Sequence, residues 1–268
     1  NHPNHPPRTL LLLAFAVIYV VWGSTYLAIR VVVETMPPFL SAAARFLFAG
    51  VLFLAFLVWR GIPFPGRREW QLASVTGLLL CVGGNGLVVW AEKSISSGLA
   101  ALLVALTPVW FALLDWVRPG GKRPEVKTVL GIVIGFAGVI LLVNGRSGPD
   151  SNGGSLIAAL AVVAAGISWA AGSLYARYAG RAESPWMNAA AQMICGGAGL
   201  LVLSLALGEP SQVQWNAISA RSIVAFVYLI VFGSWLGFST YVWLLRVSTP
   251  SRVSTYAYVN PTIAIFLG

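Results

Sequence analysis

Long apolar runs, separated by short polar segments, make up most of the chain. A run of roughly 17 to 25 apolar residues can cross the hydrocarbon core of a bilayer, ~30 Å thick, as a single helix. Such runs predict nine membrane-spanning helices, at residues 10–32, 39–59, 71–91, 98–117, 128–144, 155–176, 187–208, 223–245 and from 253 to the end. The last run is too short to complete a crossing. We therefore expect an all-α polytopic membrane protein.

The composition excludes a soluble protein. Hydrophobic residues make up 58% of the chain and charged residues 9%, whereas a typical soluble domain has about 25% charged residues. The excess apolar surface must face lipid, so the bilayer is an expected partner. The net charge of +9 could indicate nucleic-acid binding, but no basic cluster stands apart from the apolar segments. We expect no nucleic-acid partner.

Lysine and arginine side chains predict the orientation of the helices. With the N-terminus in the cytoplasm, twelve of these cations lie inside, and only Arg30, Lys93, Arg146 and Arg221 lie outside. Positive charge concentrates on the cytoplasmic side of membrane proteins, so we predict a cytoplasmic N-terminus. Arg45 lies within a span, and we expect its side chain to snorkel outward to the membrane surface; the alternative is that it faces inward and binds substrate or bridges two helices.

One stretch of the chain occurs twice. Residues 22–54 return without a gap as residues 169–201, at an offset of 147. Tryptophan, arginine and proline stay in register: Trp22 falls on Trp169, Arg30 on Arg177 and Pro38 on Pro185. Apolar helices share leucine and alanine by chance, but these matches indicate two copies of one unit. The copies are predicted at residues 9–145 and 154–268.

The second part of each copy matches at an offset of 153. Gly84 falls on Gly237, and Thr107-Pro108 falls on Asn260-Pro261. Five spans precede the second copy, and this odd number inverts the copies relative to each other. The partner of the span at 128–144 would begin after Gly268. We therefore expect two inverted-topology five-helix repeats, with ten spans in the natural protein and nine present here, the ninth cut short.

Inverted repeats are typical of secondary transporters, whose substrate sites lie near the midplane where helices are interrupted. Pro108 and Pro261 stand near the middle of the fourth and ninth spans. A proline within a helix lacks an N–H and frees the carbonyl four residues back. Thr107 and Asn260 would add polar side chains at each bend. The alternative is a packed proline kink that binds no ligand.

Other polar and aromatic residues within the spans are candidates for the same site. Asn85 lies in the middle of the third span, where its amide either binds substrate or bridges two helices. Trp22 and Trp169 are equivalent by repeat and would flank a central cavity, although an aromatic stripe also occurs in ordinary helix packing. Tyr258 shares a predicted face with Ser254 and Pro261 in the ninth span.

The residues that catalysis or metal binding would need are missing from the spans. Histidine occurs only at His2 and His5, in a polar N-terminal tail, and the two cysteines, Cys81 and Cys195, lie apart within apolar runs. Glu92 and Asp115 fall near helix ends, so no carboxylate is expected in mid-membrane to relay protons. We predict no enzyme activity, no metal and no cofactor, and the sequence does not support proton coupling.

Several segments resemble one family. They are Trp22-Gly23-Ser24-Thr25-Tyr26, Arg45-Phe46-Leu47-Phe48-Ala49-Gly50, Ala105-Leu106-Thr107-Pro108 and residues 131–142. They are similar to EamA-domain proteins of the drug/metabolite transporter superfamily, and within it to YddG-like amino-acid and metabolite exporters. The resemblance implies a bacterial inner-membrane exporter with a cavity lined by spans 1, 3, 4, 6, 8 and 9. The residues it implies there are Trp22, Asn85, Thr107, Pro108, Trp169, Ser239, Tyr258 and Asn260, and the midplane argument adds Pro261.

These observations lead to one hypothesis and its alternatives. We expect a secondary transporter that exports small metabolites, amino acids including aromatic ones among them, by alternating access through an aromatic, uncharged cavity. Such a cavity suits a zwitterion or a flat ring. The alternatives are a non-transporting membrane scaffold or sensor subunit, a channel, and a transporter of another metabolite class such as a nucleobase or drug-like cation. The substrate, the coupling ion and the oligomeric state stay open.

Overall fold

The computed structural model describes residues 6–121, 123, 126, 129–130, 133–134, 154–180 and 183–267. Every regular element among them is helical. The first half contains α1 (Arg8–Val33), α2 (Pro38–Trp59), α3 (Arg67–Gly77), the π-helical η1 (Leu78–Gly86), α4 (Leu87–Ala91), α5 (Ser97–Val104) and α6 (Thr107–Val117). The fifth predicted span, 128–144, lies largely outside the described residues.

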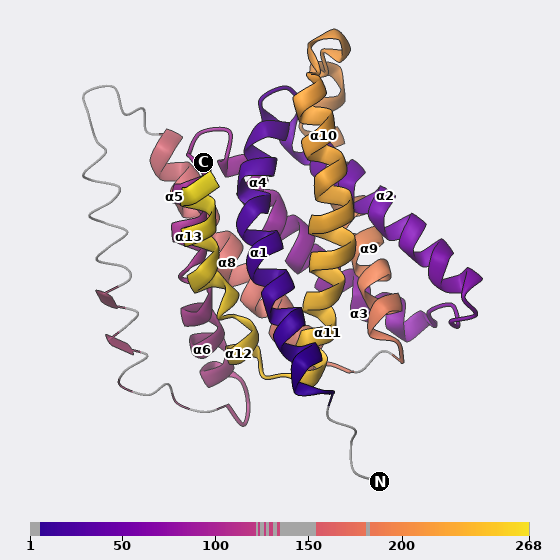
Figure 1. Cartoon of the computed structure of the whole chain (residues 1–268), viewed down its shortest axis with the longest axis vertical. Helices are drawn as coiled ribbons and strands as arrows, with labels where there is room; N and C mark the ends of the chain where they lie inside the picture. Colours follow the sequence, from indigo (N-terminus) through magenta and orange to yellow (C-terminus); the bar gives the residue numbers. More distant parts are fainter. Residues whose placement is uncertain are drawn as a thin grey trace.

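The second half repeats this order. It contains α8 (Gly154–Tyr178), α9 (Pro185–Ala206), the short 3₁₀ turns η2 (Glu209–Gln212) and η3 (Trp215–Ala217), α10 (Ala220–Tyr228), the π-helical η4 (Leu229–Phe238), α11 (Ser239–Val247), α12 (Pro250–Val253) and α13 (Tyr256–Leu267). In Figure 1, α1 begins at the bottom of the view, beside the N-terminus, whereas α8 begins at the top left. The two halves therefore run in opposite directions.

Seven helices among the described residues are long and apolar enough to cross a membrane. They are Arg8–Val33, Pro38–Trp59, Arg67–Ala91, Ser97–Val117, Leu156–Tyr178, Pro185–Ala206 and Ala220–Val247. Each coincides with a span predicted from the sequence. Many of their large apolar side chains, such as Leu12, Phe48 and Val202, are exposed on the outside of the bundle. A membrane protein places such side chains against lipid, so the predicted all-α polytopic fold is confirmed.

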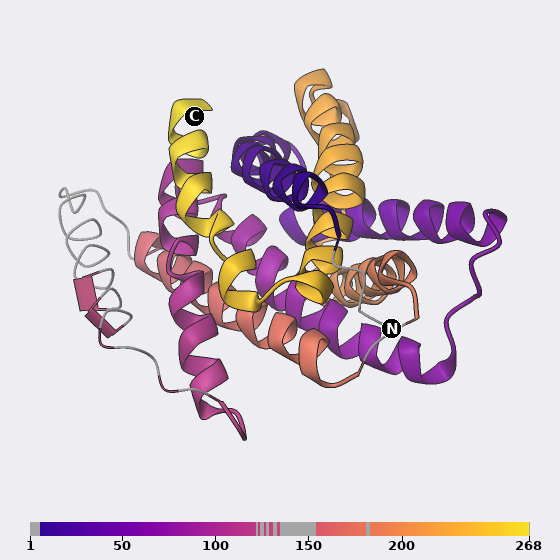
Figure 2. The ribbon, with the colours of Figure 1, turned by 60° about the horizontal axis from the view of Figure 1, so that its bottom comes forward.

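Repeat-equivalent glycines bring α2 and α9 into close contact. The two helices have 22 residues each, and their bounds differ by the repeat offset of 147. A Cβ atom placed on Gly50 would lie 2.8 Å from Ile194, and one on Gly197 would lie 2.9 Å from Leu47. Leu47 and Ile194 are themselves repeat equivalents. Small residues allow membrane helices to approach this closely, and Figure 2 shows α2 and α9 beside each other.

Two equivalent arginines cap the end of the third membrane span of their own half, at α4 in the first half and at α11 in the second. The guanidinium of Arg30, in the last turn of α1, donates to the backbone carbonyl of Glu92, just after α4. Arg177, in the last turn of α8, donates to the carbonyls of Leu245 and Ser248 at 2.5 and 2.8 Å. The last carbonyls of a helix have no partner within the helix and carry partial negative charge. Each arginine satisfies them and links two helices of one repeat.

The fourth and ninth spans are both broken, but only the first break lies at the predicted proline. α5 ends at Val104, and α6 begins at Thr107 with Pro108 in its first turn, where no backbone N–H is needed. In the ninth span the break lies between α12 and α13, before Tyr256, and Pro261 lies inside α13. The prediction of an interruption at Pro261 is therefore wrong in position.

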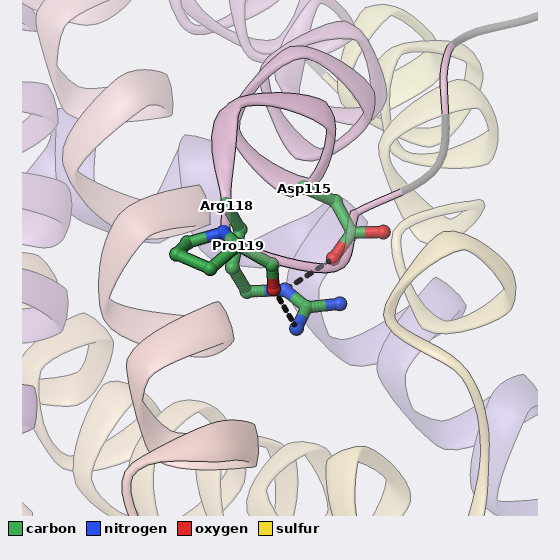
Figure 3. Close-up of polar contacts among 3 residues, drawn as sticks. All are labelled: Asp115, Arg118 and Pro119. Atoms are coloured by element: carbon green, nitrogen blue, oxygen red, sulfur yellow. Dashed lines mark hydrogen bonds and ion pairs between the residues drawn. The ribbon is translucent and has the colours of Figure 1, made fainter.

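Arg118 ties the end of α6 to the end of α8. Figure 3 shows its side chain folded back over the turn, where Nε bonds the carboxylate of Asp115 at 3.0 Å and Nη1 donates to the carbonyl of Pro119 at 3.2 Å. Its Cζ also lies 3.8 Å from the ring centroid of Tyr178, the last residue of α8. This contact fixes one end of the α6–α8 pair, and the start of α6 and the middle of α8 line the site described next.

Candidate functional site

A cavity of about 70 Å³ lies where the two halves meet. It is lined by Trp22, Thr25, Tyr26, Ile29, Arg45, Gly84, Asn85, Val88, Val104 and Thr107 from the first half, and by Ala165, Gly166, Trp169, Gly233, Phe238 and Tyr256 from the second. This volume is enough for several water molecules. The spans that contribute are those the family resemblance implies, with the second span added through Arg45.

An aromatic cluster forms one wall of the cavity. The rings of Trp22 and Trp169 meet edge to face with centroids 5.4 Å apart. Trp22 also lies 4.9 Å from the centroids of both Tyr241 and Tyr256. Edge-to-face and tilted contacts at these distances are favourable because they pair ring edges with ring faces. The cluster joins helices α1, α8, α11 and α13, so it connects the two halves at the cavity.

Hydrogen bonds hold the polar edges of these rings. The indole N–H of Trp22 donates to the carbonyl of Gly233 at 3.3 Å. The indole N–H of Trp169 donates to the hydroxyl of Tyr241 at 2.8 Å, and that hydroxyl is also bonded to Ser173. Because both tryptophans have partners for their single donors, their rings offer the cavity apolar surface.

The π-helical segments supply the backbone around the cavity. Gly84 and Asn85 belong to η1, and Gly233 and Phe238 belong to η4. η1 and η4 occupy nearly equivalent positions in the two halves, at the repeat offset of 153. A π-helical turn widens the helix and is found often at functional sites. The hydrophobic pattern predicts uninterrupted helices here and gives no sign of these π-helical segments.

Arg45 corrects two expectations. Its side chain is only 4% exposed and lines the cavity, so it does not snorkel to the membrane surface. Its Nε donates to the hydroxyl of Ser234 at 2.9 Å, and Nη1 lies 3.5 Å from Oδ1 of Asn85. The cavity is therefore not uncharged: among the described residues that line it, Arg45 is a cation and none is a carboxylate. Arg45 points inward because η4 packs against this face of α2 and supplies a hydroxyl acceptor.

Four of the residues singled out from the sequence come together at the cavity: Trp22, Asn85, Thr107 and Trp169. Thr107 is 1% exposed, and its hydroxyl has no hydrogen-bond partner. Its repeat equivalent, Asn260, is also 1% exposed, but the side chain of Asn260 has hydrogen-bond partners. With the nitrogen of its amide facing the carbonyls of Tyr19 and Tyr256, Asn260 donates to both, at 3.1 and 3.0 Å. Asn260 thus joins α1 to the start of α13.

The other predicted residues lie outside the cavity lining. Pro108 and Pro261 belong to α6 and α13, next to the polar residues Thr107 and Asn260. Ser239 is buried, and its hydroxyl has no partner. Tyr258 is 59% exposed, whereas Tyr256 lines the cavity. The break before α13 changes the helical phase, so the predicted face through Tyr258 does not point inward.

Tyr256 and Gly233 line the cavity but were not predicted from the sequence, and the inward orientation of Arg45 was the less favoured of its two predicted orientations. The helix break hid Tyr256, and nothing in the spacing distinguishes Gly233 from other membrane glycines. Thr25 and Tyr26 follow Trp22 in the motif shared with the family, and Tyr26 shares its helical face. That face contained the signal that could have placed Tyr26 at the cavity.

Two smaller cavities occupy equivalent positions in the two halves. One, of about 50 Å³, is lined by residues that include Ala176, Gly180, Asn188, Gln192 and Val242. The other, of about 10 Å³, is lined by residues that include their equivalents Ile29, Val33, Ser41, Arg45 and Val89. Gln192 is 1% exposed, and neither atom of its side-chain amide has a hydrogen-bond partner. The position of Arg45 is therefore taken in the second half by an unpartnered amide.

Glu92 lies at a helix end, as expected from the sequence, and its side chain is buried there. It follows the span Arg67–Ala91, is 0% exposed, and neither of its carboxylate oxygens has a hydrogen-bond partner. Burial raises the pKa of this carboxyl well above its usual range, and the charge of Arg30 opposes the shift. Within the part of the chain that the structure describes, no group of His, Cys, Asp and Glu residues could hold a metal ion. Cys81 and Cys195 are free thiols.

Comparison with known proteins gives consistent matches along the chain. The model of the EamA-like transporter family matches residues 9–144 and again residues 156–268. The inner membrane transporter YedA of Escherichia coli (strain K12) is 38% identical over 259 residues, which cover 95% of this chain and 80% of YedA. The transporter YvbV of Bacillus subtilis (strain 168) is 29% identical over 259 residues, covering 96% of this chain and 82% of YvbV. A crystal structure of a protein with 22% identity superposes with a TM-score of 0.71 over 97% of this chain and 88% of its own. That structural likeness concerns the fold alone.

Proposed function

Because the chain belongs to the EamA-like transporter family, we propose that it exports small metabolites, amino acids including aromatic ones among them, by alternating access. In this mechanism the two inverted halves exchange conformations, so that a site between them opens to one side of the membrane and then to the other. The observation that carries the proposal is the central cavity, whose lining comes from both halves. A solute bound there would contact both of the parts that move.

The chemistry of the lining supports a small amphipathic solute. The aromatic surface of Trp22 and Trp169 suits a flat ring or an aliphatic side chain. Asn85 and the unpartnered hydroxyl of Thr107 add hydrogen-bonding groups beside that surface. Amino acids have both an apolar part and a polar part at this scale.

The equivalent small cavities support the alternating mechanism. In an inverted repeat, the second state is built by giving each half the conformation of the other. The cavity beside Gln192 and the one beside Arg45 differ in volume, about 50 against about 10 Å³. We propose that this difference is exchanged between the halves during transport.

The distribution of cations supports a bacterial inner-membrane location with the N-terminus in the cytoplasm. The relative YedA is named as an inner membrane transporter. The loop between α2 and α3 and the adjoining start of α3 carry Arg60, Arg67 and Arg68, which the positive-inside rule places in the cytoplasm. In that orientation α1 ends on the outer side of the membrane, near Glu92.

A flux assay tests the proposed function. The full-length protein would be reconstituted into liposomes loaded with labelled L-phenylalanine, L-leucine or L-threonine. Efflux would be compared with that from protein-free liposomes loaded in the same way. We expect faster efflux of at least one of these amino acids, and a loss of this efflux in Trp169→Ala. Trp215→Ala, at an exposed tryptophan outside the cavity, is the matched control and should behave as wild type. Efflux equal to that of protein-free liposomes for a wide amino-acid panel would contradict the proposal and favour a scaffold or sensor.

A further inference from the structure

The charge of Arg45 is held inside the membrane region without a matching acid. The side chain is 4% exposed and lines the central cavity. Among the residues that the structure describes, the ion pair within 4.0 Å joins Arg118 to Asp115 and does not include Arg45. Burying a guanidinium without a counter-charge is costly, so such residues usually face a water-filled path or a ligand.

The guanidinium is held in place by neutral groups that leave its charge uncompensated. Ser234 accepts from Nε at 2.9 Å, and Asn85 lies 3.5 Å from Nη1. The Cζ atom lies 4.6 Å from the ring centroid of Phe46. A serine hydroxyl, an amide oxygen and a ring face orient a cation but do not neutralise it. The arrangement resembles a binding group fixed in advance of its ligand.

The central cavity reaches Arg45 on the side of Gly233, and both residues line it. Gly233 has no side chain there, and a Cβ atom on it would lie 3.4 Å from Nη2 and 3.2 Å from Thr25. Asn85, with its amide also in the cavity lining, stands beside the guanidinium. A planar anion placed there could accept from Arg45 and also from the amide nitrogen of Asn85.

We propose that Arg45, together with Asn85, binds the carboxylate of the transported solute, and that the solute therefore carries a single carboxylate beside an apolar group. This inference rests on the proposed transport function and names the substrate class of the same cavity. A guanidinium binds a carboxylate through two parallel hydrogen bonds, which neutral groups cannot reproduce. The solute would neutralise the buried cation each time the cavity is filled.

The charge of the cavity favours a monocarboxylate over other classes. A phosphate monoester carries close to two negative charges at neutral pH, and one guanidinium would leave the second charge buried. A drug-like cation would meet Arg45, and no carboxylate among the described lining residues would attract it. The amino group of a zwitterion can instead lie against the indole faces of Trp22 and Trp169, because aromatic rings attract cations.

Three phenyl probes separate these possibilities on the full-length protein in liposomes. Efflux of labelled L-phenylalanine would be measured with unlabelled 3-phenylpropionate or phenethylamine as competitor. The first competitor keeps the carboxylate and lacks the amine, and the second keeps the amine and lacks the carboxylate. We expect 3-phenylpropionate to inhibit and phenethylamine to have little effect. Equal inhibition by both, or stronger inhibition by phenethylamine, would overturn the proposal.

Variants of Arg45 give a second test. Arg45→Gln installs the residue that the second half has at the equivalent position, Gln192, and should weaken carboxylate inhibition roughly 10- to 100-fold. Arg45→Lys keeps the positive charge but loses the paired N–H donors of the guanidinium, so its inhibition by the carboxylate should lie between that of wild type and that of Arg45→Gln. Arg221→Gln removes an exposed cation on α10 and should match wild type. Undiminished carboxylate inhibition in Arg45→Gln would contradict the assignment.

A binding measurement separates failure of the inference from failure of the proposed function. The melting temperature of the purified protein would be followed with increasing 3-phenylpropionate and, separately, phenethylamine, since ligands that bind the folded state raise it. A rise with 3-phenylpropionate in wild type that disappears in Arg45→Gln supports the subsite even when no flux is found. The absence of any rise with 3-phenylpropionate in wild type overturns the subsite, even when flux of another solute is present. Ser234→Ala, which releases Nε, serves if Arg45→Gln does not fold, and should weaken the same rise.

Discussion

The indole of Trp22 lies directly on Gly237, where a Cβ atom would come within 2.5 Å of the ring nitrogen. The equivalent contact has its partners exchanged: Trp169 lies on Gly84, where a Cβ atom would come within 2.6 Å of the ring. Each tryptophan thus rests on the glycine of the other half. The two contacts cross between the halves and bring the aromatic cluster to the centre of the molecule.

These contacts predict the effect of adding one methyl group. Alanine in place of glycine normally favours a helix, but at Gly84 and Gly237 the new Cβ overlaps an indole. We expect Gly84→Ala and Gly237→Ala each to destabilise the protein by about 1–3 kcal/mol through overpacking. The melting temperature in detergent would show this. Gly98→Ala is the control, since its Cβ would lie 3.4 Å from Ile265, an ordinary contact. Equal stability of all three variants would mean that the indoles are not held where the structure places them.

Thr107 and Asn260 occupy equivalent positions and are predicted to respond differently. The hydroxyl of Thr107 has no partner, so Thr107→Val should leave the melting temperature unchanged or raise it slightly. The same change should slow amino-acid efflux if the hydroxyl contacts the solute. Asn260→Leu breaks two bonds to backbone carbonyls and should lower stability by about 1–3 kcal/mol. The reverse ranking of the two melting temperatures would contradict the assignment.

Gln192 is predicted to favour transport at the expense of stability. Both polar atoms of its amide are buried and unpartnered, and replacing such a group with an apolar one of similar shape is neutral or stabilising. We expect Gln192→Leu to keep or raise the melting temperature, and to slow efflux because the amide is needed when the halves exchange conformations. Asn188→Leu, in the same cavity lining, provides a comparison. A large loss of stability in Gln192→Leu would show that the amide has a partner in this state.

The buried carboxyl of Glu92 makes the stability of the folded protein depend on pH. Burial raises the pKa of this carboxyl from 4.5, with opposition from Arg30. The folded protein therefore keeps a proton that the unfolded chain releases above about pH 4.5, and the free energy of unfolding falls as the pH rises through the raised pKa. Glu92→Gln cannot lose this proton, so we expect it to remove that part of the decline. Melting temperatures between about pH 5 and about pH 8 would show the difference. Parallel curves for the two proteins would rule out a neutral buried Glu92.

The orientation is tested by labelling introduced cysteines from outside the cell. Phe64 is exposed in the loop between α2 and α3, and Ser94 is exposed in the loop after α4. With the N-terminus in the cytoplasm, a membrane-impermeant maleimide should label Ser94→Cys in intact cells and should label Phe64→Cys only after lysis. The opposite pattern would invert the proposed topology.

The sequence was sufficient to predict the helices and the repeat, because both depend on local patterns. Apolar length specifies a span, and matched tryptophan, arginine and proline residues revealed the equivalence of α1–α2 and α8–α9. The same matches placed Trp22 and Trp169 at the centre. These predictions needed no knowledge of which helix packs against which.

The charge and the detailed lining of the cavity could not be predicted in this way. Whether Arg45 points outward or inward depends on η4, which lies almost two hundred residues later and supplies Ser234. The phase of α13 depends on a helix break before Tyr256, and no proline marks that break. A sequence pattern carries no direct signal for such contacts, since they arise only when distant segments meet.

Alternating access through the central cavity is tested most directly by counterflow. Liposomes containing the full-length protein would be preloaded with unlabelled L-phenylalanine or left unloaded, and the entry of labelled L-phenylalanine followed over time. A site that faces one side at a time returns faster when it carries a solute, so we predict faster entry into preloaded liposomes and no such acceleration with Trp169→Ala. Entry at the same rate into preloaded, unloaded and protein-free liposomes would contradict the account.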